Sequence, residues 1–224
     1  MTARPHPRDH DPTLSTSALW SAIHTERAAL ASDLADISAE EWSTPSLCAE
    51  WTVEEVVAHL TAAASTARLA WVRSIVAARF RPAVHNQRRL VEHLGTSPTQ
   101  TLERFQAVVT STVAPSGHTA AWLGEVIVHG EDVRRPLGIV RTPPTRTTAA
   151  VAHFFARQDF AVNSRSAVKG LRLEASDGPF AVGTGPLVTG STLALVLAMA
   201  GRASAYEELT GPGVAELVER AQPA

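Results

Sequence analysis

The stretch WTVEEVVAHL (residues 51–60) decides the fold, because it predicts a well-anchored helix that carries a histidine. Thr52 is a favourable N-cap residue, and Glu55 three positions later completes a capping box. The helix is expected to continue to about Phe80. His59 lies two turns inside it, at the margin of the apolar stripe, where a side chain faces the interior and is still reachable from a cleft. The stretch therefore fixes a potential ligand on one face of a helix.

A second stretch, GEVIVH (residues 124–129), supplies a carboxylate and an imidazole. Glu125 and His129 are four positions apart, so they share one face of a helix. If antiparallel packing brings His59 opposite them, two imidazoles and one carboxylate converge, which is the ligand set of an open catalytic zinc-type site. Taken separately, His59 also fits a structural histidine, and the pair also fits a simple hydrogen bond on a helix surface.

Four amphipathic helices are expected in the first part of the chain, at 14–37, 52–80, 97–115 and 119–135, with a short helix within 83–94. The third has clear start signals, because Ser97 is an N-cap and Pro98 takes the first helical position. Connections of moderate length between such helices favour a bundle whose core can host a metal ion.

The pattern changes after a Pro-rich break at 141–145. A helix is expected at 147–163, and Asp177-Gly178 between the apolar stretches 171–175 and 180–182 predicts a β-hairpin. A third strand is expected at 187–188, followed by helices at 191–201 and 214–220. The predicted organisation is a disordered leader (1–13), a metal-binding helical bundle (14–140), and a linking helix plus a small α+β domain (147–224).

The composition is that of a globular protein with a sizeable core, with 45% hydrophobic and 19% charged residues. A formal net charge of -2 argues against a general nucleic-acid binder, which normally carries a basic stripe. The longest apolar run, 193–200, is too short to span a membrane, and the polar N-terminus contains no stretch of signal-peptide type. We therefore expect a cytoplasmic protein.

Two further groups of residues have open interpretations. Cys48 is the only cysteine, which excludes an intrachain disulfide and a four-thiolate zinc site. It is interpreted as a small buried apolar side chain rather than as a nucleophile, because no His or Lys neighbours it in sequence. The charged residues within 131–135 fit either a solvated helix end with local ion pairs or a pair of arginines that anchor a substrate.

At this point the motifs resemble a known family. Residues 46–60, with Cys48, Trp51 and His59, resemble the signature "C-x-x-W-t-v-x-x-v-x-x-H-l" of the mycothiol-dependent maleylpyruvate isomerase family, within the DinB/YfiT-like metal-binding superfamily. Residues 124–138 are similar to the second signature, "E-x-x-x-H-x-x-D-x-x-r-p-l-g". Residues 189–202 are similar, more loosely, to the family's C-terminal sterol-carrier-like domain.

The resemblance implies a mainly α protein, a DinB-like four-helix bundle followed by a small α+β sterol-carrier-like domain. It also implies that His59, Glu125 and His129 bind one divalent metal, usually zinc, and that this metal binds the thiol of mycothiol, the low-molecular-weight thiol of actinobacteria. A coordinated thiol is deprotonated to its nucleophilic thiolate. In an isomerase the thiolate adds to a conjugated double bond, rotation follows, and elimination returns the thiol; in an S-transferase the adduct leaves.

The arginines implied by the resemblance are less closely tied to a motif. Arg202 is the nearest candidate for the family's catalytic arginine in the second domain. Arg134 and Arg135 are candidates for binding the thiol cofactor.

Several functions are compatible with these motifs. The leading hypothesis is a metal- and thiol-dependent isomerase or S-transferase that acts on a small-molecule electrophile, as a monomer or homodimer, without nucleic-acid or membrane partners. The alternative is a non-catalytic metal-binding or stress-related protein, in which a fourth protein ligand such as His85, His118 or Asp132 completes the coordination. A third possibility is hydrolysis by metal-activated water, with Glu131 or Asp132 as general base.

Overall fold

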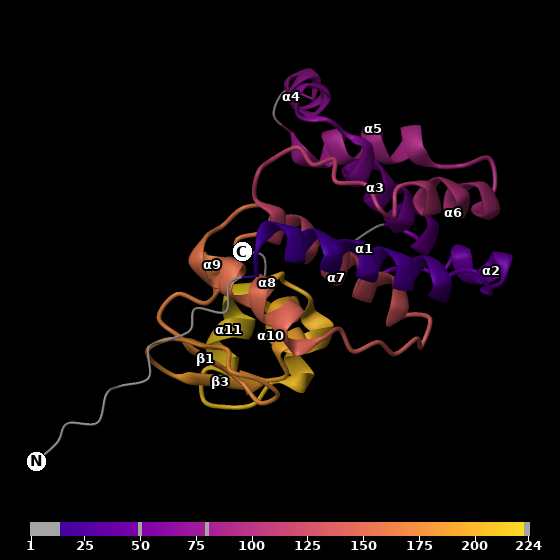
Figure 1. The fold of residues 1–224 in the computed structure, drawn as a ribbon. Helices are drawn as coiled ribbons and strands as arrows, with labels where there is room; N and C mark the ends of the chain where they lie inside the picture. Colours follow the sequence, from indigo (N-terminus) through magenta and orange to yellow (C-terminus); the bar gives the residue numbers. More distant parts are fainter. Residues whose placement is uncertain (1–13, 49–50, 79–80, 222–224) are drawn as a thin grey trace, which may run out of the picture.

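The computed structural model describes residues 14–48, 51–78 and 81–221. The predicted leader, residues 1–13, lies outside this range. The described part is mainly helical, with a small three-stranded sheet in its C-terminal third (Figure 1), so the predicted fold class is confirmed. The helices of the first part are α1 (Thr16–Asp33), α2 (Ala39–Trp42), α3 (Val53–Ser65), α4 (Arg68–Ala77), α5 (Pro82–His93), α6 (Pro98–Ala107) and α7 (Thr119–Arg134). The second part contains α8 (Thr145–Arg157), α9 (Ser164–Ala167), β1 (Arg172–Ala175), β2 (Ala181–Gly183), β3 (Leu187–Gly190), α10 (Thr192–Met199), the 3-10 helix η1 (Ala203–Glu208) and α11 (Val214–Ala221).

Helices α1, α3, α6 and α7 form the bundle, and α5 packs on the outside of α3. Their facing sides supply fully buried side chains such as Ile23, Val56, Phe105 and Leu123. Because α3 packs directly against α7, the face of one helix is held opposite the face of the other. This contact positions the site described below.

The N-terminus of α3 has the predicted capping box. Thr52 Oγ1 accepts a hydrogen bond from the backbone N–H of Glu55 (3.3 Å), and the Glu55 carboxylate accepts one from the backbone N–H of Thr52 (2.8 Å). Two N–H groups that a helix start leaves unpaired are thereby satisfied, which stabilises the helix by about 1 kcal/mol. The first turns of α3 are consequently a firm support for His59.

The predicted continuous helix 52–80 is wrong, because the structure breaks it into α3 and α4. Ser65 and Thr66 donate their hydroxyls to the carbonyls of Thr61 (2.8 Å) and Ala62 (2.6 Å), and Thr66 itself takes an extended conformation. Such side-chain hydrogen bonds compete with continuation of the helix. Beyond the break, α4 projects from the top of the bundle (Figure 1).

The sheet has the order β2-β1-β3. Strands β1 and β2 are antiparallel and form the hairpin predicted around Asp177-Gly178, with Leu173 opposite Val182. Strand β3 pairs with the other edge of β1 in parallel, with Leu173 opposite Val188. Helix α10 then begins at a serine cap, since Ser191 Oγ accepts from the backbone N–H of Ala194 (3.1 Å).

One apolar core runs through both parts of the chain, from Leu19 in α1 to Leu217 in α11. Helix α8 packs against both α7 and α10, and the segment after α10 reaches the last turn of α7, where Arg202 contacts Asp132. In the described residues no helix has both the length and the apolar character that a membrane crossing requires.

Candidate metal centre

Helices α3 and α7 bring His59, Glu125 and His129 together. His59 Nε2 donates a hydrogen bond to Glu125 Oε1 (2.7 Å), and His129 Nε2 lies 3.7 Å from the same oxygen. One ligand atom from each residue lies within 4.8 Å of the other two. The three side chains are largely buried, with 10%, 18% and 11% exposed in the same order. Two imidazole nitrogens and one carboxylate oxygen therefore face a common point at the edge of a pocket.

Aromatic contacts fix the imidazole rings. The Trp51 ring lies 4.9 Å from the His59 ring, and the two histidine rings meet edge to face at 4.9 Å. The indole N–H of Trp51 donates to Gln87 Oε1 (3.2 Å), which ties Trp51 to α5. The residue that precedes the cap of α3 thus also covers one side of the metal-ligand candidates.

The buried carboxylate of Asp132 orients His129 by a hydrogen bond from Nδ1, the ring nitrogen that does not face Glu125. His129 Nδ1 donates to Asp132 Oδ2 (2.9 Å), so its Nε2 is directed toward Glu125. Asp132 is fully buried and also accepts two hydrogen bonds from Arg202, from Nε (2.8 Å) and Nη2 (2.7 Å). A carboxylate that holds the second nitrogen of a histidine is typical of histidines that bind metals. Arg202 reaches this position from the end of α10, 70 residues away in sequence.

Hydrogen bonds and charges within this group shift the pKa values of Glu125 and His129 in the direction opposite to the shift that burial causes. Burial alone raises the pKa of Glu125, but the hydrogen bond from His59 and the charges of His129, His59 and Arg202 lower it to about 2. Burial alone lowers the pKa of His129, but Asp132, Cys48 and the charge of Glu125 raise it to about 10. Without a metal ion, the site is therefore held together by an ionised carboxylate and a protonated imidazole.

A sequence model described as the mycothiol maleylpyruvate isomerase N-terminal domain matches residues 23–134, half of the chain. The chain belongs to this family. The crystal structure of the mycothiol-dependent maleylpyruvate isomerase is similar, with a TM-score of 0.63 and 18% identity over 89% of this chain and 93% of that chain. A histidine-to-alanine mutant of that enzyme gives 0.62 and 17% over the same shares. At these identities the likeness shows a common fold. No curated protein matches the chain.

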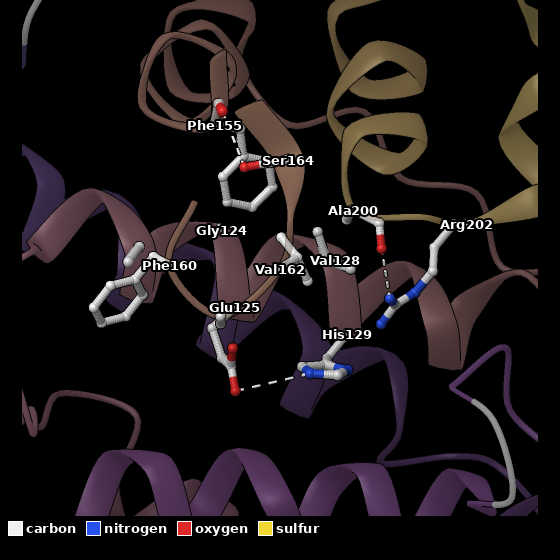
Figure 2. A pocket seen from close by; sticks show the side chains of 12 residues that line it. Gly124, Glu125, Val128, His129, Phe155, Phe160, Val162, Ser164, Ala200 and Arg202 are labelled. Carbon is white, nitrogen blue, oxygen red and sulfur yellow. Dashed lines mark hydrogen bonds and ion pairs between the residues drawn. The ribbon is translucent and has the colours of Figure 1, made fainter. Parts of the chain in front are cut away.

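In this member of the mycothiol maleylpyruvate isomerase family, two of the metal-ligand candidates, Glu125 and His129, line a small pocket. In Figure 2, Glu125 and His129 lie at the bottom of the pocket and Arg202 at the right, with Phe155 above them and Phe160 to the left. The pocket lies between the bundle and the second part of the chain, because α7, α8, the segment after α8 and the end of α10 all contribute to its wall.

The two other predicted arginines lie elsewhere. Arg134 is 2% exposed and donates from Nε to Asp33 of α1 (2.7 Å). Arg135 donates to Glu131 (3.0 Å) and pairs with Glu208. Neither residue lines the pocket. The helix end at 131–135 is buried rather than solvated, because Glu131, Asp132 and Arg134 are at most 5% exposed. The local ion pair expected there is present between Arg135 and Glu131.

The position of Cys48 beside the candidate metal centre could not be recognised from the sequence. It is half-buried, and its sulfur lies 3.8 Å from Arg202 Nη2. Together with His129 and Asp132 it forms a second group of potential ligand atoms within 4.8 Å of one another. Only the close packing of the loop before α3 on α7, seen in the hydrogen bond from the Leu47 N–H to the Asp132 carbonyl (3.0 Å), brings this cysteine to the site.

The three residues considered as a fourth protein ligand of the metal, His85, His118 and Asp132, lie in different places. Asp132 adjoins His129, but on its Nδ1 side rather than on the side that faces Glu125. His85 bonds to Ser74 of α4 (2.8 Å), and the ring of His118 packs against that of Phe160 (5.3 Å). Neither of these histidines belongs to a group of potential ligands found among the described residues.

Proposed function

We propose that this protein is a divalent-metal-dependent enzyme that uses mycothiol, of the isomerase or S-transferase type, with His59, Glu125 and His129 as metal ligands. The observation that carries the proposal is the convergence of these three donors beside a pocket. Membership of the mycothiol maleylpyruvate isomerase family supports the choice of thiol.

The donor set fits a zinc ion. Tetrahedral ligands at about 2.0–2.1 Å from a metal are roughly 3.4 Å apart. The observed separations of Glu125 Oε1 from the two histidine nitrogens, 2.7 Å and 3.7 Å, lie on either side of this value. The carboxylate behind His129 supports the same conclusion, because it fixes the tautomer that leaves Nε2 free to coordinate. Small side-chain rotations thus suffice to form the site.

A bound divalent metal supplies Lewis acidity, which keeps a coordinated thiol in its nucleophilic thiolate form at neutral pH. Asp132 holds His129 in the coordinating orientation, and Arg202 in turn keeps Asp132 ionised, since its charge helps to lower the pKa of that carboxyl despite burial. Arg202 also lines the pocket. We therefore assign it to orienting the substrate beside the metal, as the candidate catalytic arginine.

Three protein donors favour catalysis over a purely structural metal. A structural zinc ion normally has four protein ligands, whereas a catalytic one keeps a position open. Asp132 is committed to Arg202 and lies behind His129, so it is a poor fourth ligand. Hydrolysis by activated water is less well supported, because Glu131 points to Arg135 and Asp132 to Arg202. The non-catalytic metal-binding protein is the second candidate, since the same three donors can hold an ion without a reaction.

Metal analysis of the purified protein tests the proposal. Wild type, His59→Ala and His129→Ala are compared for bound zinc, with and without mycothiol, and His24→Ala, which changes a histidine of α1, is the matched control. We expect stoichiometric metal in wild type and control, and loss of metal in both site variants. Retention of full metal by both site variants would overturn the ligand assignment. Loss of metal without any effect of mycothiol on the wild-type metal, read by cobalt substitution and absorption spectra, would favour the non-catalytic protein.

A further inference from the structure

Helix α4 carries an apolar stripe that the rest of the described chain does not cover. The α4 stripe consists of Leu69, Val72 and Val76, whose side chains are 80%, 44% and 54% exposed. No residue of α4 is buried, and the helix projects from the top of the bundle (Figure 1). Single exposed apolar side chains are common, whereas apolar side chains that share one face of a projecting helix are typical of an interaction surface.

The opposite face of α4 packs on α5 and fixes which side of the helix is turned outward. Ser74 is hydrogen-bonded to His85 Nδ1 (2.8 Å), and the Trp71 ring meets the His85 ring edge to face at 5.9 Å. At about 100° per residue, the α4 stripe spans roughly 60° of the helix circumference, and Trp71 and Ser74 lie roughly 130° and 170° from its centre. The packing on α5 therefore turns the α4 stripe toward solvent.

Exposed arginines flank the α4 stripe on both sides. By the same geometry, Arg68 and Arg73 lie about 40° beyond its two edges, and Arg81 follows in the segment between α4 and α5. Among the described residues these three arginines form no ion pair, and the only acidic residue of the two helices, Glu92, is paired with Arg89. The chain as a whole has a formal net charge of -2, so the positive charge is local to this surface.

Helix α5 extends the same combination of apolar and basic side chains. Val91 is 58% exposed, and the exposed Arg88 lies three positions before it, on the same helix face. Arg88 Nη1 donates to the carbonyl of Ala77 at the end of α4 (3.3 Å), which joins this face to α4. Four of the seven exposed large apolar side chains of the described residues thus lie on α4 and α5.

The shape and charge of this surface distinguish between the partners that could cover it. A second copy related by a twofold axis would place the arginines against themselves, and a helix of ten residues is small for the roughly 800 Å² per partner that a stable dimer buries. A partner helix normally binds in a groove, whereas α4 projects. A bilayer surface accepts a projecting helix, because aliphatic side chains enter the headgroup boundary while flanking arginines reach anionic headgroups.

We propose that α4 and the exposed face of α5 dock the protein on an anionic membrane surface. The α4 stripe enters the boundary between headgroups and acyl chains, and Arg68 and Arg73 contact the lipid phosphates on either side of it. The short apolar runs of the sequence argue against a spanning helix but not against a contact of this kind. The inference is independent of the metal centre, because none of these residues belongs to the candidate ligand set.

Flotation of the full chain with lipid vesicles tests the proposal. Vesicles of phosphatidylcholine alone are compared with vesicles that contain about one third phosphatidylglycerol, at low salt and at about 0.5 M salt. We expect binding to the anionic vesicles only, and loss of this binding at high salt, because exposed charges are then screened. Equal binding to both kinds of vesicle contradicts the role of the arginines and overturns the proposal.

Matched variants separate this surface from the general effects of charge and hydropathy. Arg73→Gln should weaken binding about fivefold, whereas Arg146→Gln, at an exposed position of α8, should have little effect. Leu69→Ser should weaken it roughly tenfold, and Val140→Ser, at a position 91% exposed, should not. All four positions are exposed, so the variants should keep the Tm of wild type. Equal loss of binding in test and control variants overturns the proposal.

Failure of the wild type to bind anionic vesicles also overturns the proposal, and two measurements then identify the partner. A concentration-dependent dimer in analytical ultracentrifugation that Leu69→Ser abolishes would assign the surface to a second copy of the chain. Binding of a labelled amphipathic peptide of leucine and glutamate, weakened by Arg73→Gln, would assign it to an acidic helix of another protein.

Discussion

Replacement of Asp132 by asparagine should weaken the fold and the metal site together. Asp132 is fully buried and accepts two hydrogen bonds from Arg202 and one from His129. The amide has one oxygen instead of two and no charge, so it leaves a buried guanidinium without its counter-ion. Loss of one partner of a buried ion pair costs about 3–5 kcal/mol. For a chain of this length that corresponds to a fall in Tm of roughly 6–20 °C.

The assay is thermal unfolding of the metal-free protein, followed by circular dichroism, together with a zinc titration of the folded protein. Asp132→Asn should also lower zinc affinity about 10- to 100-fold, because His129 loses the partner that orients it. Asp36→Asn, at an exposed position, is the control and should change Tm by less than about 2 °C. The double variant Asp132→Asn/Arg202→Met should be more stable than Asp132→Asn alone, since it removes the unpaired cation.

The stabilisation by Asp132 should also depend on pH, in a direction that follows from the pKa of its carboxyl. Burial raises the pKa of Asp132, but its hydrogen bonds with Arg202 and His129 and their charges lower it below 3.8. A carboxyl whose pKa is lowered by folding stabilises the folded state above its unfolded pKa, and this stabilisation is lost as the pH falls through the folded value. The Tm difference between wild type and Asp132→Asn should therefore be largest between about pH 5 and pH 6.5 and should shrink below about pH 4. It should also shrink as the pH rises above 6.5, because Asp132 is what raises the pKa of His129 to about 10, and stabilisation by a protonated group is lost as the pH approaches its folded pKa. An unchanged Tm together with unchanged zinc affinity would refute the reasoning.

Three further predictions concern the support of the site. Thr52→Ala removes the capping box of α3 and should lower the free energy of unfolding by about 1 kcal/mol, seen as a fall in Tm of roughly 2–4 °C, without loss of metal from the folded protein; a drop in metal content would show that the cap also shapes the site. Gly124→Ala places a Cβ 2.9 Å from the Phe155 ring, where α7 packs on α8, and should lower the free energy of unfolding by about 1–3 kcal/mol in a urea titration. Gly117→Ala is the control, because no atom lies within 4 Å of the added Cβ, and it should not show this loss. Zinc at about 100 times its dissociation constant should stabilise wild type by about 2.7 kcal/mol and leave the Tm of His129→Ala unchanged; equal stabilisation of both would indicate a different metal site.

The elements that the sequence predicted well are those with strong local signals. The helix at 119–135 is confirmed as α7 (Thr119–Arg134), and the capping box and the hairpin at Asp177-Gly178 are both present. Caps, turns and apolar periodicity act over a few residues, so they can be recognised without knowledge of the tertiary structure. The break between α3 and α4 was missed because Ser65 and Thr66 fit a helix by pattern, and only their hydroxyl bonds to the preceding turn end it.

The candidate site likewise combines residues that local spacing predicts with contacts that only the tertiary structure reveals. Glu125 and His129 share a helix face by their spacing, and Asp132 three positions after His129 could have been recognised as its partner by the same rule. The contacts of Arg202 with Asp132 and of Cys48 with Arg202 join residues 70 and 154 positions apart. They arise from the packing of α8 between α7 and α10 and of the loop before α3 on α7, which periodicity does not specify.

The second part of the chain therefore has a direct role at the site. Arg202, which follows α10, donates two hydrogen bonds to Asp132, the carboxylate that orients His129. The same arginine that secures the ligand also forms the polar end of the pocket wall. Because the Arg202 guanidinium both pairs with Asp132 and lines the pocket, its charge is already compensated by Asp132 when a substrate arrives. The polarity of this part of the pocket therefore depends on the ion pair that orients His129.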